Sequence, residues 1–230
     1  MISALLLSLA TPQSAVEAER AFAAMAQSKG QWTAFRSFAA PDAILFKDGP
    51  RNAHELLDGL PDPRVSVAWW PGFSWVSCDG DLAVNTGPTL RDGGRKHGSF
   101  TTVWQRQHDG NWKWLADNGR DMPETVPARE NPLVRKARCA AGPFAAERAV
   151  ISSGVMHQWE GEQAGFGLDG RKLPEARAII SEGSARDGTL HWRYSTFPGF
   201  GEDAFGLSVW MWNGKAHELV LHEISGVAKR

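Results

Sequence analysis

The sequence predicts an α+β fold in which helices come first and an antiparallel sheet follows. Apolar residues recur at helical spacing over residues 16–60. They then give way to short strand-like runs over residues 65–118, which glycine and proline turns separate. A related strand hairpin occurs again near the C-terminus. We therefore expect helices that pack on one face of a sheet, followed by a mainly β partial repeat.

An imperfect internal repeat is the most informative signal in the chain, and it relates residues 98–119 to residues 206–226. Each copy runs from a glycine through a strand with tryptophan and a glycine turn into a second strand that ends near an acidic residue. A similar strand precedes each copy, at residues 80–84 and 188–192. Such a repeat identifies a fold and not a reaction.

Three helices are expected ahead of the first sheet. The first begins near Val16 with alanines and a phenylalanine on one face, and Gly30 ends it. The second carries aromatic residues at helical spacing from Trp32 and ends before Pro41, because a proline restricts the residue ahead of it. Asn52 is placed to cap the third helix.

The chain divides into a first unit at residues 16–121 and a second, β-rich unit at residues 144–230. Residues 122–143 form the expected linker, because four prolines stand there among charged residues. The second unit lacks the long amphipathic helices of the first. Its sheet must therefore bury one face on the first unit or on another subunit, which makes a homodimer one expected partner state.

Residues 1–15 match the apolar part of a secretory signal, with Ala10 or Ala15 at the end of a small-residue cleavage site. No basic segment precedes the apolar run, so the first turn of a helix is the alternative. We expect a periplasmic or secreted protein, and a cytoplasmic one if the run is not a signal. No later segment is apolar over the length of a bilayer, so no membrane partner is predicted.

Charge and composition exclude some partners. The 25 basic and 26 acidic residues are interspersed and give a formal net charge of −1. A nucleic-acid partner is therefore not predicted, because such proteins carry a clustered basic surface. Eleven tryptophans stand beside a single tyrosine. Tryptophans in this number fill a core or line a ligand pocket, and the count alone does not separate the two.

Cys78 and Cys139 are the only cysteines, which excludes a disulfide-rich scaffold and a cysteine-built metal site. They can pair if the protein is exported, and otherwise Cys78 is a small buried side chain. Histidines with the spacing of a metal motif do not occur. We therefore predict no metal and no cofactor.

The order of elements resembles that of SnoaL-like and ketosteroid-isomerase-like domains of the nuclear transport factor 2-like superfamily. The motifs that carry this resemblance are Phe-x-x-x-Asp-Ala-x-x-Phe at residues 38–46 and the hairpin of residues 97–104 and 109–114. The resemblance covers about residues 17–121, and residues 188–226 look like the hairpin half of a degenerate second copy. It implies a cone, in which helices pack on a strongly curved sheet around a pocket.

Some members of that superfamily isomerise steroids or cyclise polyketides by proton transfer through a carboxylate. The base of the isomerase-like members falls at Lys47 when counted from Asp42, and Asp48 follows one step later. A slip of one residue on a strand reverses its face, so Asp48 is a displaced candidate base. Asp117 at the end of the last strand is the second candidate, although the Asn-Gly that follows it is also typical of a turn.

Aromatic side chains predict a pocket more strongly than titratable ones. Alternate residues of a strand share a face, and the helices supply further rings above that face. The predicted ligand-binding residues are Trp32, Phe35, Phe46, Phe100, Trp104 and Trp114. Three functions remain open: a protein that binds a small apolar ligand, an isomerase, cyclase or hydrolase that uses a carboxylate, and a structural or dimerisation module with a filled cone.

Overall fold

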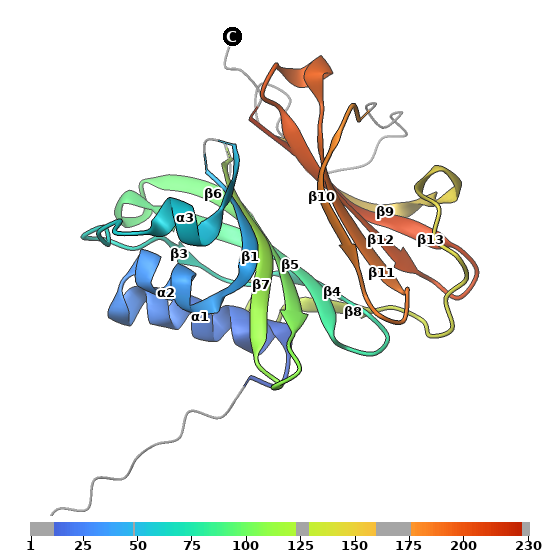
Figure 1. Cartoon of the computed structure of the whole chain (residues 1–230), viewed down its shortest axis with the longest axis horizontal. Helices are drawn as coiled ribbons and strands as arrows, with labels where there is room; N and C mark the ends of the chain where they lie inside the picture. The colour runs from blue at the N-terminus through green and yellow to red at the C-terminus, as the bar shows by residue number, and fades with distance from the viewer. Residues whose placement is uncertain (1–11, 48, 123–128, 160–175, 227–230) are drawn as a thin grey trace, which may run out of the picture.

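The computed structural model describes residues 12–47, 49–122, 129–159 and 176–226. These residues form three layers: helices, an eight-stranded sheet and a five-stranded sheet (Figure 1). The predicted α+β fold with a β-rich partial repeat is confirmed. Within the described residues no helix has the length and apolar character needed to cross a membrane.

The helices are α1 (Ala15–Lys29), α2 (Gln31–Phe38) and α3 (Ala53–Leu57). Ser14 caps α1 by accepting a hydrogen bond from the backbone N–H of Glu17 at 3.2 Å. Gly30 ends α1 with φ of 111°, a conformation that glycine adopts without strain. Asn52 caps α3 through the N–H of Glu55 at 3.1 Å, as its position in the sequence predicts.

The first sheet lies under these helices and is mixed. Its strands are β1 (Ala39–Phe46), β2 (Pro50–Asn52), β3 (Ala68–Trp69), β4 (Phe73–Val76), β5 (Leu82–Arg91), β6 (Lys96–Arg106), β7 (Trp112–Asp121) and β8 (Leu133–Lys136). The order is β2-β1-β7-β6-β5-β4-β8, with β3 on β5. The pairs β1–β7 and β4–β8 are parallel, where the sequence predicts an antiparallel sheet. Both pairs join segments far apart in the chain, which local patterns do not reveal.

A β-bulge at Leu115 decides which side chains of β7 face the helices. Pairing with β6 shifts from Val103–Ala116 to Trp104–Trp114, so Leu115 is the extra residue. Trp114 therefore packs in the helix-side core, whereas Ala116 packs on the opposite face of the sheet. A prediction from simple alternation places both on one face and is wrong beyond the bulge. The strand then continues to Asp121, so the Asn-Gly after Asp117 lies within a strand and forms no turn.

The second sheet repeats the geometry of the first. Its strands are β9 (Val150–Trp159), β10 (Ile179–Ser184), β11 (Leu190–Thr196), β12 (Phe205–Trp212) and β13 (His217–Ser225), in the order β10-β11-β12-β13-β9. The hairpin β12–β13 carries a bulge at Val220, between the pairs Val209–Leu221 and Trp210–Leu219. β9 runs parallel to β13 as β1 does to β7. The repeat read from the sequence is thus a repeat of sheet, bulge and parallel edge.

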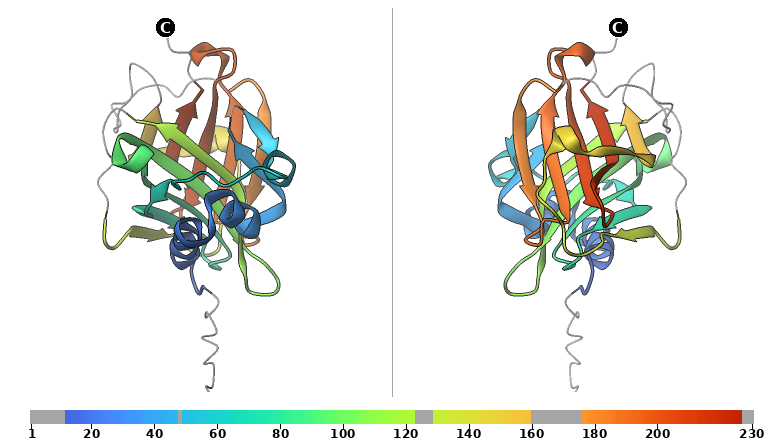
Figure 2. Two further views of the ribbon diagram at one scale, coloured as in Figure 1. Left: turned by 90° about the vertical axis from the view of Figure 1, so that its left-hand side faces the viewer. Right: turned by 90° about the vertical axis from the view of Figure 1, so that its right-hand side faces the viewer.

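The two sheets pack face to face, on the side of the first sheet away from the helices (Figure 2). The buried side chains that the first sheet contributes include Phe46, Trp75, Leu82, Val84, Val103 and Ala116, and those of the second include Trp192, Tyr194, Leu207, Val209 and Leu221. The second sheet therefore buries its face on the first unit of the same chain.

A buried ion pair crosses this interface. Arg120 of β7 donates from Nη1 and Nη2 to the two carboxylate oxygens of Glu223 on β13, at 2.8 and 2.5 Å. Thr101 also donates to that carboxylate, at 2.5 Å. Beside this pair, Asn118 donates to Ser225 at 3.0 Å. The registers of the two hairpins make Asn118 equivalent to Glu223 and Arg120 equivalent to Ser225. Each of the two contacts therefore joins one position of the first hairpin to the other position of the second, as contacts do across a two-fold axis.

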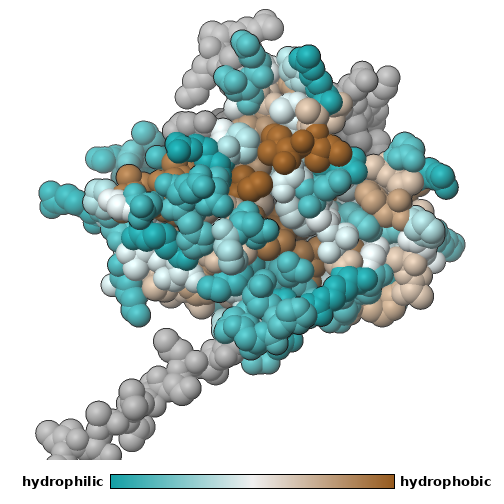
Figure 3. All heavy atoms as spheres, in the orientation of Figure 1, coloured by the Kyte–Doolittle hydropathy of each residue, from teal (hydrophilic) through white to brown (hydrophobic). Residues whose placement is uncertain are grey.

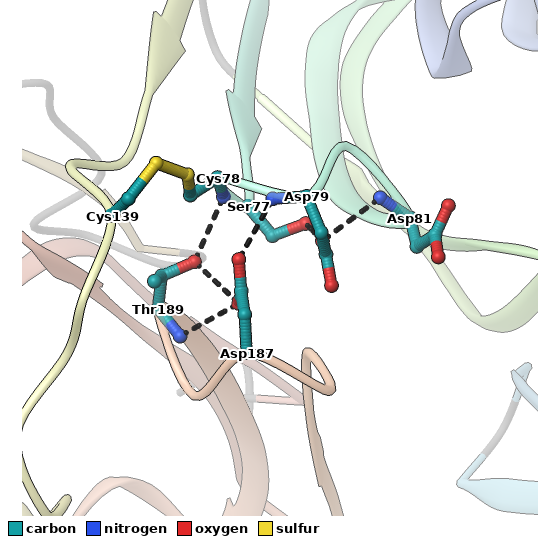
Figure 4. Close-up of a disulfide and its surroundings, with 7 residues drawn as sticks. All are labelled: Ser77, Cys78, Asp79, Asp81, Cys139, Asp187 and Thr189. Atoms are coloured by element: carbon teal, nitrogen blue, oxygen red, sulfur yellow. Dashed lines mark hydrogen bonds between the residues drawn. A yellow bond between two sulfur atoms is a disulfide. The ribbon is translucent and has the colours of Figure 1, made fainter.

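A disulfide between Cys78 and Cys139 fastens the linker to the end of β4 (Figure 4). The backbone N–H of Cys78 donates to Oγ1 of Thr189 at 2.8 Å, and that of Asp79 donates to Asp187 at 2.7 Å. Both acceptors belong to the turn between β10 and β11. The residues predicted as a linker thus contain a strand, β8, and the cysteine pairing that the sequence leaves open is formed.

Candidate functional site

A cavity of about 220 Å³ lies between the helices and the concave face of the first sheet. We call it the cavity. Its apolar lining consists of Phe22, Trp32, Phe35, Leu45, Phe46, Val67, Trp69 and Phe100. Its polar lining consists of Gln31, Lys47, Thr89, Arg91, Asp117 and Arg120, together with Gly119. A largely apolar wall with a few polar groups is the usual composition of a small-molecule site.

The predicted ligand-binding residues divide into two groups. Trp32, Phe35, Phe46 and Phe100 line the cavity, although the ring of Phe46 stacks on Tyr194 of the second sheet, with 4.0 Å between ring centres. The other two residues, Trp104 and Trp114, are fully buried in the helix-side core and are not part of the wall. A ligand-binding role for all six residues stays a prediction.

Glycines on either side of Phe100 shape the cavity. Gly119 on β7 and Gly87 on β5 are its cross-strand neighbours. A Cβ atom on Gly119 would meet no atom within 4 Å, so the empty volume extends to the backbone there. A Cβ on Gly87 would instead overlap the carbonyl oxygen of Trp70. The sequence offers only the composition typical of a turn at Gly119 and does not reveal this role.

Asp117 places a buried carboxyl on the cavity wall. The residue is 6% exposed, and Thr102, its cross-strand neighbour, donates to Oδ2 at 2.7 Å. Burial raises its pKa to about 7, against the opposing effects of the Thr102 hydrogen bond and the charge of Arg120. A carboxyl with this pKa exchanges protons near neutral pH.

The other predicted base, Asp48, lies outside the described residues. The structure does place its neighbour Lys47, which follows the end of β1 and lines the cavity. Its Nζ atom lies 5.8 Å from the ring centre of Trp32. The position to which the superfamily resemblance assigns a base thus carries a cation that contacts an aromatic ring.

A second buried carboxyl, Glu19 of α1, was not among the predicted residues. Its two oxygens accept hydrogen bonds from the indole N–H groups of Trp69 at 2.8 Å and Trp104 at 2.6 Å, and from Asn85 at 3.3 Å. Burial raises its pKa to about 8, the hydrogen bonds oppose this effect and Asp117 adds to it. Glu19 does not line the cavity, but it fixes Trp69, which does. Its spacing from Ala15 and Phe22 already places it on the apolar face of α1.

Gln31, the first residue of α2, supplies a fixed donor in the cavity lining. The backbone N–H of Val67 donates to Oε1 of Gln31 at 3.0 Å, which sets the orientation of the side-chain amide. The amide nitrogen contacts no acceptor among the described residues. It remains able to donate to an oxygen of a bound molecule.

Metal ligands are not gathered anywhere in the described part of the chain, where no group of three or more histidine, cysteine, aspartate or glutamate side chains is placed to hold an ion.

The second sheet does hold a counterpart of the Thr102–Asp117 pair. At the equivalent cross-strand positions, Ser208 contacts Nδ1 of His222 at 3.0 Å.

No protein-family model matches the sequence, and no curated protein matches it. About half of the chain matches solved structures of the nuclear transport factor 2-like superfamily. A candidate ketosteroid isomerase from Parabacteroides distasonis has a TM-score of 0.41 at 16% identity, over 50% of this chain and 93% of that chain. A candidate aromatic ring hydroxylase from Novosphingobium aromaticivorans has a TM-score of 0.34 at 16% identity, over 48% and 87%.

A nuclear transport factor 2-like superfamily protein from Salmonella enterica serovar Typhimurium has a TM-score of 0.35 at 13% identity, over 50% of this chain and 90% of that chain. No statement about fold or activity rests on these matches. The fold rests on the element order and strand pairings described above.

Proposed function

We propose that the first unit binds a small, largely apolar ring compound in the cavity, with one polar group of that compound against Asp117. The observation that carries this proposal is the empty volume itself, walled by aromatic rings and by one buried carboxyl. Rings exclude water and supply most of the contact area, while a single carboxyl fixes orientation.

The volume restricts the size of the ligand. An apolar cavity of about 150 Å³ holds benzene, and sites for drug-sized molecules measure roughly 300–1,000 Å³. A cavity of about 220 Å³ lies between these values. A single substituted ring or two small fused rings fit this volume, whereas the four rings of a steroid exceed it.

Filling the cavity tests the binding proposal. Gly119→Leu places a side chain into the empty volume from a strand position where φ is not in the left-handed region. We expect single-ring compounds that bind the wild-type chain by calorimetry to lose measurable affinity for this variant. Gly199→Leu is the matched control, because a Cβ there also meets no atom within 4 Å but lies in the second unit. Equal binding by the Gly119→Leu variant would show that the cavity is not the site.

Proton-transfer catalysis is the second candidate function, and the raised pKa of Asp117 favours it. In an isomerase or cyclase a carboxylate removes a proton from the carbon beside a carbonyl, and a donor stabilises the enolate oxygen. Asp117 from β7 and Gln31 from α2 supply these two groups in the lining of one cavity. The test is deuterium uptake from heavy water at that carbon in a bound cyclic ketone, followed by NMR. Asp117→Asn should abolish uptake and retain binding, and uptake that persists in this variant would exclude Asp117 as the base.

The third hypothesis is a filled cone that serves as a dimerisation module, and the empty cavity does not support it. The face of the second sheet that motivated a dimer is covered by the first sheet of the same chain. A homodimer through another surface stays a prediction, as does the absence of a nucleic-acid partner.

Export to an oxidising compartment is the location that the disulfide supports, because disulfides persist in the periplasm and outside the cell. The start of α1 bears on the cleavage site. Ser14 caps α1, and the carbonyl of Ala15 accepts a hydrogen bond from Asn85. Cleavage after Ala10 leaves both contacts in place, whereas cleavage after Ala15 removes them, so we propose the earlier site.

A further inference from the structure

The cavity adjoins a second hollow of about 770 Å³, which we call the cleft. The cleft lies between the first unit and the second sheet, because its wall includes Pro50 and Asp121 on one side and Thr196 and Phe205 on the other. Figure 3 shows apolar surface along the seam between these two parts. Four residues line both hollows: Phe46, Lys47, Arg91 and Gly119. A molecule whose ring lies in the cavity can therefore extend a substituent toward the cleft.

Two of these four shared residues are cations. The ammonium group of Lys47 lies over the ring of Trp32 and forms no ion pair with a carboxylate in the part of the chain that the structure describes. It approaches the junction from the end of β1. An ammonium group at the edge of an apolar hollow attracts an anionic substituent, since the low-polarity wall screens its charge less than water does.

Arg91 approaches the same junction from the end of β5. Its Nη2 atom forms an ion pair with Asp121. Its Nε atom is buried and donates to no acceptor among the described residues. A buried N–H without an acceptor is costly, and a ligand oxygen at the junction would supply the missing hydrogen bond.

Among the described residues that line both hollows, Lys47 carries a charge that no ion pair neutralises, whereas the charge of Arg91 is shared with Asp121. Arg120 on the cavity wall is neutralised by Glu223 in the buried ion pair. Burial raises the pKa of Asp117, so this carboxyl is largely protonated below neutral pH. Glu19 adds no charge there for the same reason. Glu202 and Asp203 line the cleft but not the cavity.

We propose that the ligand of this site is a ring-bearing carboxylate, whose ring fills the cavity and whose carboxylate lies between Lys47 and Arg91 at the junction with the cleft. This inference rests on the proposed binding function and adds the chemical class of the ligand. The guanidinium group suits a carboxylate in particular, because its N–H groups match the spacing of the two oxygens.

Compounds matched in shape and different in charge test the inference. Calorimetry with phenylacetate, its neutral amide and phenethylamine compares an anion, a neutral molecule and a cation on the same ring. We expect phenylacetate to bind about 10- to 100-fold more tightly than the amide, the range of a charge-assisted hydrogen bond. Rising salt should narrow that difference, because the junction is partly open to solvent.

Two variants connect the preference to its residues. Lys47→Met and Arg91→Met keep much of the aliphatic stems and remove the charges, so each should weaken phenylacetate binding more than amide binding and narrow the difference in affinity between the two compounds. The two proposals fail in distinguishable ways. If none of the three compounds binds, the binding function itself is contradicted. If the amide binds as tightly as phenylacetate, or if phenethylamine binds best, a ring ligand remains and the carboxylate inference is overturned.

Discussion

The two sheets of this chain share an antiparallel hairpin with a bulge and a parallel edge strand, and they differ in the side chains at equivalent positions. At equivalent cross-strand positions the first holds Thr102 against Asp117, and the second holds Ser208 against His222. Asp117 faces the cavity under the helices. His222 is 2% exposed and lies edge-on to the ring of Phe197, at 5.5 Å between ring centres.

The difference teaches that a hairpin with a bulge sets where a polar pair lies, while the covering layer sets what that pair can contact. The first sheet is covered by α1 and α2, which leave empty volume above Asp117. On the same face of the second sheet, Phe144 packs on Trp210 and on His191 instead. The hairpin and its bulge alone therefore do not specify a functional site.

The largest loss of stability should come from removing one charge of the buried ion pair between the two sheets. Glu223→Gln leaves the charge of Arg120 buried and uncompensated, which costs about 3–5 kcal/mol. Urea unfolding measures this change. Glu182→Gln is the matched control, since it removes the partner of Arg193 in a more exposed pair and should cost less than about 1 kcal/mol.

A double variant sharpens that result. Arg120→Met combined with Glu223→Leu removes both charges and retains the volume, so much of the stability should return. If Glu223→Gln unfolds at the same urea concentration as the wild type, the pair does not hold the second sheet on the first.

The second effect concerns the disulfide that joins the linker to β4. Replacing Cys78 and Cys139 with serine opens a covalent loop with a sequence separation of 61, and the expected loss is about 2–4 kcal/mol. Thermal unfolding of the variant should match that of the wild type in reductant. A wild-type chain that is unaffected by reductant, while the variant is destabilised, would assign the loss to the serine substitutions instead of the bond.

A third prediction concerns the pH dependence of stability that the carboxyl of Asp117 contributes. Asp117 has a pKa of about 7 in the folded chain and 3.8 as its reference value, so the folded state binds more protons between these values. Its contribution to stability is full below pH 3.8 and is lost as the pH rises through 7. Asp117→Asn should reduce the slope of stability against pH in this window by up to about 1.4 kcal/mol per pH unit.

Glu19, whose pKa is about 8, contributes a slope of the same sign that the Asp117→Asn variant retains. Asp109→Asn serves as the control, because hydrogen bonds from Asn111 lower the pKa of Asp109 and move its effect below this window. An unchanged slope in the Asp117→Asn variant would contradict the burial of a neutral carboxyl at this position.

Local signals in the sequence predicted most of the fold. The caps at Gly30 and Asn52 and the repeat of the hairpins depend on residues close together in the chain, and all are present. Of the predicted site residues, Trp32 and Asp117 lie on the wall of one cavity. Their proposed roles stay predictions.

The remainder depends on contacts between distant residues. The bulge at Leu115 reverses the faces of β7, and alternation along one strand cannot reveal it. The partners of Glu19 lie 50 to 85 residues away. The pair of Arg120 with Glu223 spans 103 residues. Each is fixed by tertiary packing, which local propensity does not encode.

The contacts between the two sheets also determine how the cleft responds to dilution of the protein. Between separate subunits, an interface in which Arg120 meets Glu223 and Asn118 meets Ser225 would form by mass action and weaken at low concentration. Here one chain carries both sides, so their association is intramolecular. The cleft wall, to which both units contribute residues, therefore assembles in a single chain at any protein concentration.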